Sequence, residues 1–165
     1  MSPSNAVSPS STDRIEQRIE LKATPARVWR ALTDHREFGE WFRVKLEAPF
    51  VPGQRTRGHI THPGYEHLVM EVQVQRMEPE RLFSFTWHPY AVDPKVDYSK
   101  EPPTLVEFTL EPRTSSVLLT VTESGFDRLP PGRRDEAFRM NAGGWAQQVR
   151  NVQAHVESAH VGAKP

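Results

Sequence analysis

The chain has 165 residues, 21 of them basic and 21 acidic, so its formal net charge at pH 7 is zero when the histidines are neutral. This length suits one domain, and the balanced charge argues against nucleic acid or an acidic membrane surface as a partner. The absence of cysteine excludes disulfides, thiolate catalysis and cysteine-ligated zinc, and it suits a reducing cytoplasm.

Both ends of the chain are predicted to lie outside the domain. Residues 1–13 are rich in Ser and Pro and lack the basic start and apolar segment of a signal peptide, so we expect a disordered leader. Residues 159–165 are expected to form a disordered tail, which leaves one domain over residues 14–158. No apolar run approaches the roughly 18 residues that a membrane span needs.

The domain is predicted to begin with one strand and two short helices. Apolar and charged residues alternate from residue 14 to residue 21, which is typical of a half-buried strand. Thr24 followed by Pro25 indicates a helix N-cap and the first helical position, and Asp34 can cap a second helix. Because both helices are short, they must dock on a sheet to be stable.

Six further strands are predicted from alternating apolar residues between turn signals. No helix separates these strands, which excludes a parallel sheet. Their expected positions are 42–46, 54–61, 68–74, 83–87, 106–110 and 117–121.

Apolar residues at steps of three and four predict one long amphipathic helix over residues 133–158 that covers the sheet. The predicted fold class is therefore α+β, with a curled antiparallel sheet around a C-terminal helix. Gly143 and Gly144 lie inside this helix, where each costs about 1 kcal/mol relative to alanine. They either admit another backbone or a ligand, or they serve sheet packing or a local bend.

Two polar residues are predicted near the covered face of the sheet. Glu123 continues the alternation of the last strand, so its carboxylate should point inward and must be paired, hydrogen-bonded or protonated. It is either an acid, base or polar anchor at a cavity mouth, or a structural partner of nearby backbone or an arginine. Asn141 lies one helical turn before Trp145 and either presents its amide to a ligand or caps against the sheet.

Aromatic side chains of the strands and of the long helix are predicted to face the same interior. Core packing is their default role, and the alternative is a cavity wall, because a long helix and a curled sheet leave space between them. The candidate ligand-binding residues are Trp145, Glu123, Asn141, Trp87, Phe85, Phe108, Phe138 and Met70.

The sequence predicts no metal site, no cofactor and no catalytic residue. His59 and His62 point to opposite faces of a strand, and a Pro-Gly turn separates them from His67, so the three are interpreted as surface histidines. Glycine-rich phosphate loops, Ser-centred elbows and HExxH motifs do not occur. Arg55 and Arg57 project from one strand face and form an anion site if that face is interior, or a solvated pair if it is exterior.

The longest irregular stretch runs from residue 89 to residue 103 and contains four prolines. Long loops in compact domains are usually functional or disordered. We expect a semi-ordered flap, which acts either as a lid over a cavity mouth or as an arm that docks a partner.

Four stretches of the sequence carry a family likeness: TPARVWRALTDHREFGEWF (24–42), EPERLFSFTW (78–87), LTVTESGF (119–126) and NAGGWAQQV (141–149). They resemble the START-like (SRPBCC) helix-grip superfamily, in particular the branch similar to the C-terminal domain of the activator of Hsp90 ATPase. The resemblance covers residues 14–158 and implies a helix-grip fold: seven curled antiparallel strands around the C-terminal helix, with two short helices after the first strand. One departure is Gly53-Gln54-Arg55-Thr56, where the family has a glycine pair followed by arginine and an aromatic residue.

The leading functional hypothesis is a cytoplasmic domain that binds a small lipid-like or aromatic molecule between the sheet and the C-terminal helix. A first alternative is a protein-interaction module that resembles the chaperone activator and has a chaperone as its partner. A second is an enzyme resembling the superfamily's cyclases and lyases, acting on an aromatic or polyketide-like substrate. A monomer or a homodimer is expected.

Overall fold

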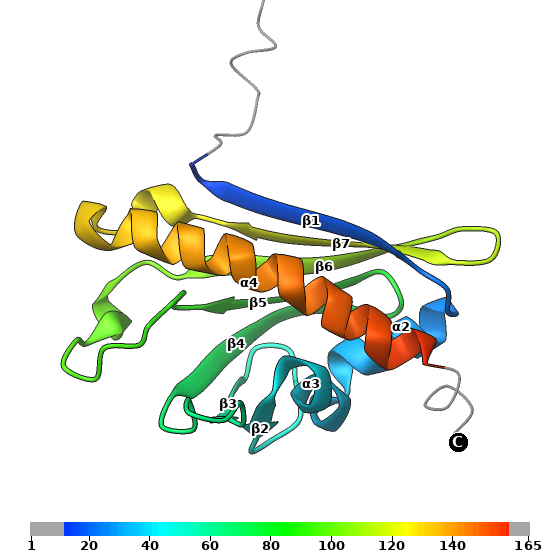
Figure 1. The fold of residues 1–165 in the computed structure, drawn as a ribbon, viewed down its shortest axis with the longest axis horizontal. Helices are drawn as coiled ribbons and strands as arrows, with labels where there is room; N and C mark the ends of the chain where they lie inside the picture. The colour runs from blue at the N-terminus through cyan, green and yellow to red at the C-terminus, as the bar shows by residue number, and fades with distance from the viewer. Residues whose placement is uncertain (1–11, 159–165) are drawn as a thin grey trace, which may run out of the picture.

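The computed structural model describes residues 12–158, so most of the two predicted tails lie outside the described residues. Figure 1 shows a single curled sheet with helix α4 (Pro131–Glu157) running across one of its faces. Two shorter helices, α2 (Pro25–Thr33) and α3 (His35–Phe42), lie beside the C-terminal half of α4. This is the predicted α+β helix-grip fold. None of the described helices is long and apolar enough to cross a membrane.

All neighbouring strands in the sheet are antiparallel, in the order β1-β7-β6-β5-β4-β3-β2. The first strand in the chain therefore pairs with the last, and β1 and β2 form the two edges of the sheet. The strands are β1 (Arg14–Leu21), β2 (Val44–Leu46), β3 (Arg55–Ile60), β4 (Val69–Glu78), β5 (Leu82–Trp87), β6 (Thr104–Pro112) and β7 (Val117–Ser124).

The short helices begin at the caps that the sequence predicts. The Thr24 side chain accepts a hydrogen bond from the Arg27 amide at 3.1 Å, and the Asp34 side chain accepts one from the Arg36 amide at 2.9 Å. Helix α3 continues through Phe42, the residue at which the next strand was predicted to begin. Arg43, in a left-handed conformation with φ of 71°, forms the C-cap of the helix. Phe42 is therefore helical, and the prediction that it starts a strand is wrong.

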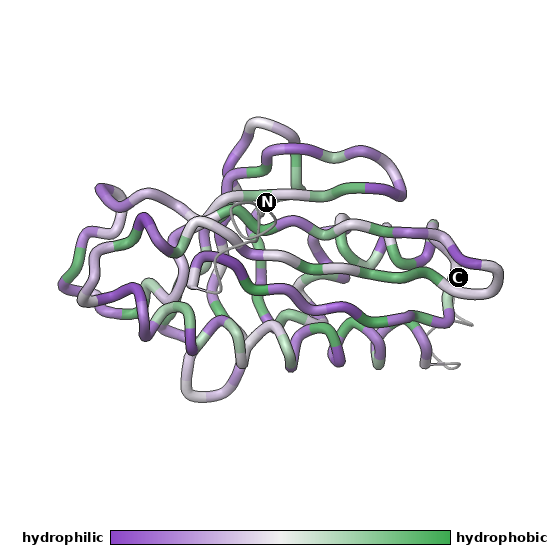
Figure 2. Tube along the Cα trace, turned by 90° about the horizontal axis from the view of Figure 1, so that it is seen from above, coloured by the Kyte–Doolittle hydropathy of each residue, from purple (hydrophilic) through white to green (hydrophobic). Residues whose placement is uncertain are grey.

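The core lies between the sheet and the helices. Along β4 the buried side chains Met70, Val72 and Val74 alternate with the exposed Val69 and Glu71, which is the period of a sheet with one covered face. Figure 2 shows the same alternation as green and purple segments along the strands. Two 3₁₀ turns, η1 (Tyr98–Lys100) and η2 (Phe126–Arg128), complete the described elements.

Candidate functional site

Glu123 is the centre of a hydrogen-bond cluster on the covered face of the sheet, and its side chain is fully buried. Its Oε2 accepts hydrogen bonds from Trp87 Nε1 at 2.7 Å and Thr104 Oγ1 at 2.6 Å. Its Oε1 accepts from Asn141 Nδ2 at 2.9 Å and Trp145 Nε1 at 2.8 Å. Four donors match the acceptor capacity of a carboxylate, so Glu123 joins β5, β6 and β7 to α4.

Aromatic rings fill the space between the middle of the sheet and α4. The Trp145 ring lies 5.7 Å from Phe108 and 5.9 Å from Trp87, measured between centroids. Phe85 lies 6.0 Å from Phe108, and Phe138 packs on Phe126 nearer the start of α4. These distances are typical of packed aromatic pairs, so this region is a dense core.

A cleft of about 630 Å³ lies next to this core. Its walls come from the end of α3, from β3, β4 and β5, and from the loop of residues 89–103. Of the eight candidate residues, Met70 and Trp87 line the cleft, whereas the other six lie behind it in the Glu123 cluster or the aromatic core. The predicted flap is thus one wall of a cavity.

The cleft exists because two neighbouring strands separate. The pairing of β4 with β5 runs from Glu78 opposite Leu82 to Gln73 opposite Thr86, and residues 69–72 of β4 continue alongside β3. After Trp87 the chain reaches Pro89, which has no amide hydrogen to extend the ladder. The space that opens between β4 and β5 beyond this last pair forms part of the cleft.

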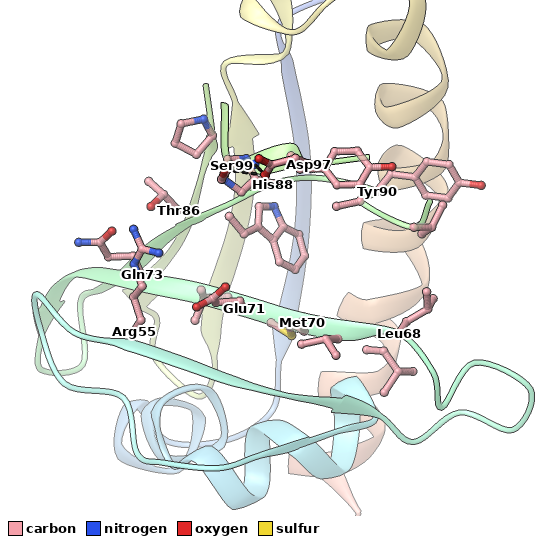
Figure 3. A pocket seen from close by; sticks show the side chains of 18 of the residues that line it. Arg55, Leu68, Met70, Glu71, Gln73, Thr86, His88, Tyr90, Asp97 and Ser99 are labelled. Atoms are coloured by element: carbon pink, nitrogen blue, oxygen red, sulfur yellow. Dashed lines mark hydrogen bonds between the residues drawn. The ribbon is translucent and has the colours of Figure 1, made fainter. Parts of the chain in front are cut away.

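The cleft has an apolar end and a polar end. Figure 3 shows Leu68 and Met70 on the side nearer α4, whereas Arg55 and Gln73 lie together on the opposite side. Arg55 is exposed, so the alternative of an interior anion site formed with Arg57 does not apply. The mixed lining suits a ligand with an apolar body and a polar group.

His88 lines the cleft just beyond the end of β5. Its Nδ1 atom is buried and has no hydrogen-bond partner among the described residues. Burial lowers the pKa of His88 below its ordinary value of 6.5; the charges of Arg133 and Arg55 act in the same direction, against those of Glu101 and Glu71. His88 was not among the predicted site residues. It directly follows Trp87, so the alternation of the strand predicts that its side chain points away from the aromatic face.

Arg133 fastens the loop of residues 89–103 to the first turn of α4. Its guanidinium donates to the carbonyls of Pro89 at 2.7 Å and Tyr90 at 2.9 Å, and its Nε lies 2.9 Å from Glu101 Oε1. The same group lies 4.6 Å from the centre of the Tyr98 ring. This role of Arg133 was not predicted from the sequence. One signal could have indicated it: a cation in the first turn of a helix is unfavourable next to the positive end of the helix dipole, so it implies a compensating partner.

A second hollow of about 630 Å³, which we term the α4 groove, runs between α4 and the residues that follow β3. It shares Phe42, Ile60 and Leu68 with the cleft, so the two hollows meet. Gly144 borders the groove, and a Cβ added to it would meet no atom within 4 Å. Sheet packing therefore does not explain this glycine.

The three strand and loop histidines do not converge. His59 Nδ1 lies 3.2 Å from the Glu66 carbonyl, and His62 Nδ1 lies 3.2 Å from an Arg43 nitrogen. Across residues 12–158, no group of three or more histidine, cysteine, aspartate or glutamate side chains is arranged to hold a metal ion.

Comparison with known protein families gives one match that covers most of the chain. The model of the family described as Activator of Hsp90 ATPase homolog 1-like protein matches residues 22–157. No curated protein matches the chain at a significant level.

Solved structures match the fold over most of the chain. Protein MLL2253 from Mesorhizobium loti has a TM-score of 0.70 at 24% identity, over 88% of this chain and 98% of that one. The solution structure of the Aha1 dimer from Colwellia psychrerythraea has a TM-score of 0.65 at 18% identity, over 87% of this chain and 96% of that one. DynU16, from the dynemicin biosynthetic locus, has a TM-score of 0.68 at 26% identity; the match covers 90% of this chain and 48% of DynU16.

Proposed function

The chain belongs to the family of activator of Hsp90 ATPase homolog 1-like proteins, and on that premise we propose that it binds a small, mainly apolar organic molecule in the cleft. The observation that carries the proposal is the cleft itself, with a volume of about 630 Å³ and an apolar end next to a polar one. Ligand pockets in proteins typically measure about 300–1,000 Å³ and combine an apolar lining with a few polar groups.

Two walls of the cleft are held in place by hydrogen bonds to residues outside it. Trp87 forms part of its wall, and the Glu123 carboxylate holds the indole nitrogen at 2.7 Å, which orients the ring. Arg133 holds the loop of residues 89–103 in place through two backbone carbonyls. A wall that is already ordered costs less entropy on binding, so these contacts favour affinity.

DynU16 adds support from the comparisons. It is 26% identical to this chain and belongs to the dynemicin biosynthetic locus, a setting of small-molecule chemistry. The chain spans about half of DynU16, so the likeness supports a small-molecule ligand without identifying one. We also propose a cytoplasmic location, since a chain without cysteine suits a reducing compartment.

A thermal-shift screen against fatty and aromatic molecules tests the proposal. A ligand at 100 times its dissociation constant stabilises the folded state by about 2.7 kcal/mol, which raises the melting temperature by about 5–11 °C for a domain of this size. Binding should weaken at least tenfold in Leu68→Asp, whose charge would enter the apolar end. Binding should persist in the control variant Leu118→Asp, because Leu118 lies on β7 away from the cleft. A screen without any shift above about 2 °C would count against the proposal.

A protein-binding role is the second candidate, and the α4 groove is the observation that favours it. Tyr65 at its rim is 52% exposed, and Gly144 leaves the helix backbone uncovered beside it. The family is described by activation of the Hsp90 ATPase, so the partner to test first is that chaperone. An increase in chaperone ATPase rate that is lost in Gly144→Arg would favour this role, whereas an unchanged rate would leave the small-molecule proposal in first place.

A further inference from the structure

The outer side of β1 is a long, unpaired strand edge. β1 has 8 residues and lies at one end of the strand order, and Figure 1 shows no described element beyond it. The strand at the other edge, β2, has only 3 residues. Very short edge strands are one way in which proteins avoid pairing with other chains, and β1 lacks this protection. β1 is therefore the edge of the sheet that can accept another strand.

The hydrogen bonds of the sheet show which backbone groups of β1 point outward. The Arg113 amide donates to the Ser116 carbonyl at 2.8 Å, so the even-numbered residues of β7 bond to β6 and the odd-numbered ones bond to β1. The β1 residues opposite these odd positions are also odd-numbered, and the Gly125 amide donates to the Asp13 carbonyl at 3.2 Å in the same phase. The amide and carbonyl groups that point out of the sheet are those of Arg14, Glu16, Arg18 and Glu20.

The side chains of these four residues alternate in charge along the exposed face of the strand. Glu16 lies 3.3 Å from Arg14 and 3.1 Å from Arg18, whose side chain is 65% exposed. Charges on an edge strand usually prevent pairing with another chain, because like charges would meet. An alternating pattern of four charges, however, shows the opposite sign at every position when the strand is reversed. The edge is thus complementary to an antiparallel copy of itself.

We infer that two copies of this chain associate by antiparallel pairing of β1 with β1, which joins the two sheets into one. The twofold axis passes between Gln17 of one copy and Gln17 of the other. Arg14 then faces Glu20 of the second copy, and Glu16 faces Arg18. Opposite charges that face each other across two strands stabilise the pair. The inference goes beyond the proposed function and does not depend on it.

Charge and backbone direction together select this register. A shift by two residues places either Glu16 opposite Glu16 or Arg18 opposite Arg18, and like charges opposite each other are destabilising. A shift by one residue places the outward backbone groups opposite groups that already bond to β7, and it turns the two exposed faces to opposite sides. With the axis at Gln17, Ile15 faces Ile19 of the second copy. Ile19 is only partly buried in the single chain, so pairing removes more of its apolar surface from water.

Sedimentation equilibrium of the full chain tests the inference. Because one strand pair is a small interface, the dimer should form reversibly over a series from about 1 µM to about 500 µM. Arg18→Glu places a carboxylate opposite Glu16 twice in the dimer, so the dissociation constant should rise at least about tenfold. The double variant Glu16→Arg, Arg18→Glu restores opposite charges and should return the constant to within about threefold of the wild-type value. The control Arg57→Glu makes the same charge change on the distant strand β3 and should leave the constant unchanged.

A disulfide tests the register directly. The chain has no cysteine, so Gln17→Cys introduces a single thiol that faces its own copy across the axis. Non-hydrogen-bonded antiparallel pairs bring the Cα atoms to about 4.5 Å, a separation that a disulfide can span. Mild oxidation should therefore give a covalent dimer on a non-reducing gel. Thr120→Cys, on β7 opposite Arg18 and one strand away from the edge, should remain monomeric under the same conditions.

The outcomes decide both the interface and its register. A wild-type protein that stays monomeric at about 500 µM, or a dimer that Arg18→Glu leaves unchanged, overturns the inference. It is also overturned if the double variant does not restore the dimer, or if Thr120→Cys cross-links as readily as Gln17→Cys. Should Arg18→Glu not fold, the double variant and the Gln17→Cys cross-link decide. All of these results leave the cleft proposal standing, because the cleft lies on β3, β4 and β5.

Discussion

The indole rings of Trp87 and Trp145 lie 5.9 Å apart, and each donates its Nε1–H group to a different oxygen of one carboxylate. That carboxylate belongs to Glu123, which is fully buried. Trp87 lines the cleft and Trp145 projects from α4 into the core, so the shared acceptor connects the cleft wall to the long helix. A change at Glu123 should therefore affect both stability and binding.

Replacing Glu123 by glutamine keeps its shape but removes acceptor capacity. The amide nitrogen would face two of the four donors, so we expect the free energy of unfolding to fall by roughly 3 kcal/mol or more. Urea denaturation measures this loss. Glu107→Gln, on the opposite face of the neighbouring strand, is the control and should change stability by less than about 0.5 kcal/mol. A loss below about 1 kcal/mol for Glu123→Gln would show that the cluster is not a major contributor.

Trp145→Ala should cost about 3–5 kcal/mol, because a buried ring in contact with Phe108, Trp87 and Phe42 is removed. The loss is measured by chemical denaturation of the ligand-free protein. If the ligand-free protein loses much less while ligand binding is abolished, Trp145 acts as a ligand contact and not as core.

Arg133→Gln should release the loop of residues 89–103 from α4. Trypsin should then cleave after Lys95 or Lys100 at least several-fold faster, which mass spectrometry of the fragments detects. Arg139→Gln is the matched control, because Arg139 lies on the same helix and is exposed. Equal cleavage rates in both variants would mean that other contacts hold the loop.

Glu37 should make stability depend on pH in the acid range. Burial acts to raise its pKa, but hydrogen bonds from His155 and Arg27 and the charges of Arg27 and Arg30 outweigh burial and hold the pKa below its ordinary 4.5. The ionised form therefore stabilises the fold above about pH 4.5, and this contribution is lost as the pH falls through the lower folded-state pKa.

Comparing the wild-type protein with Glu37→Gln tests this dependence. The difference in unfolding free energy should be largest near pH 7 and should shrink as the pH is lowered below about 4.5. Glu136→Gln serves as the control, since the Glu136 side chain is exposed and lies on a turn of α4 far along the helix from His155. A difference that stays constant from pH 7 to pH 3 would contradict the assignment.

The order of the elements and the covered face of the sheet could be read from the sequence alone. Alternation, caps and turn residues are local signals, and each is complete within a few neighbouring residues. The same alternation predicted that Glu123 points inward, because a strand side chain's face depends only on its position along an unbroken strand.

Only the tertiary structure decided which side chains meet and where the cavity lies. Trp87 bonds to Glu123 across 36 residues and Arg133 bonds to Pro89 across 44, and no local pattern records such pairings. The cleft opens where β4 and β5 separate, which depends on how two strands diverge in space. For that reason Met70 and Trp87 line the cleft, the other predicted residues do not, and His88 lines it although no local signal pointed to it.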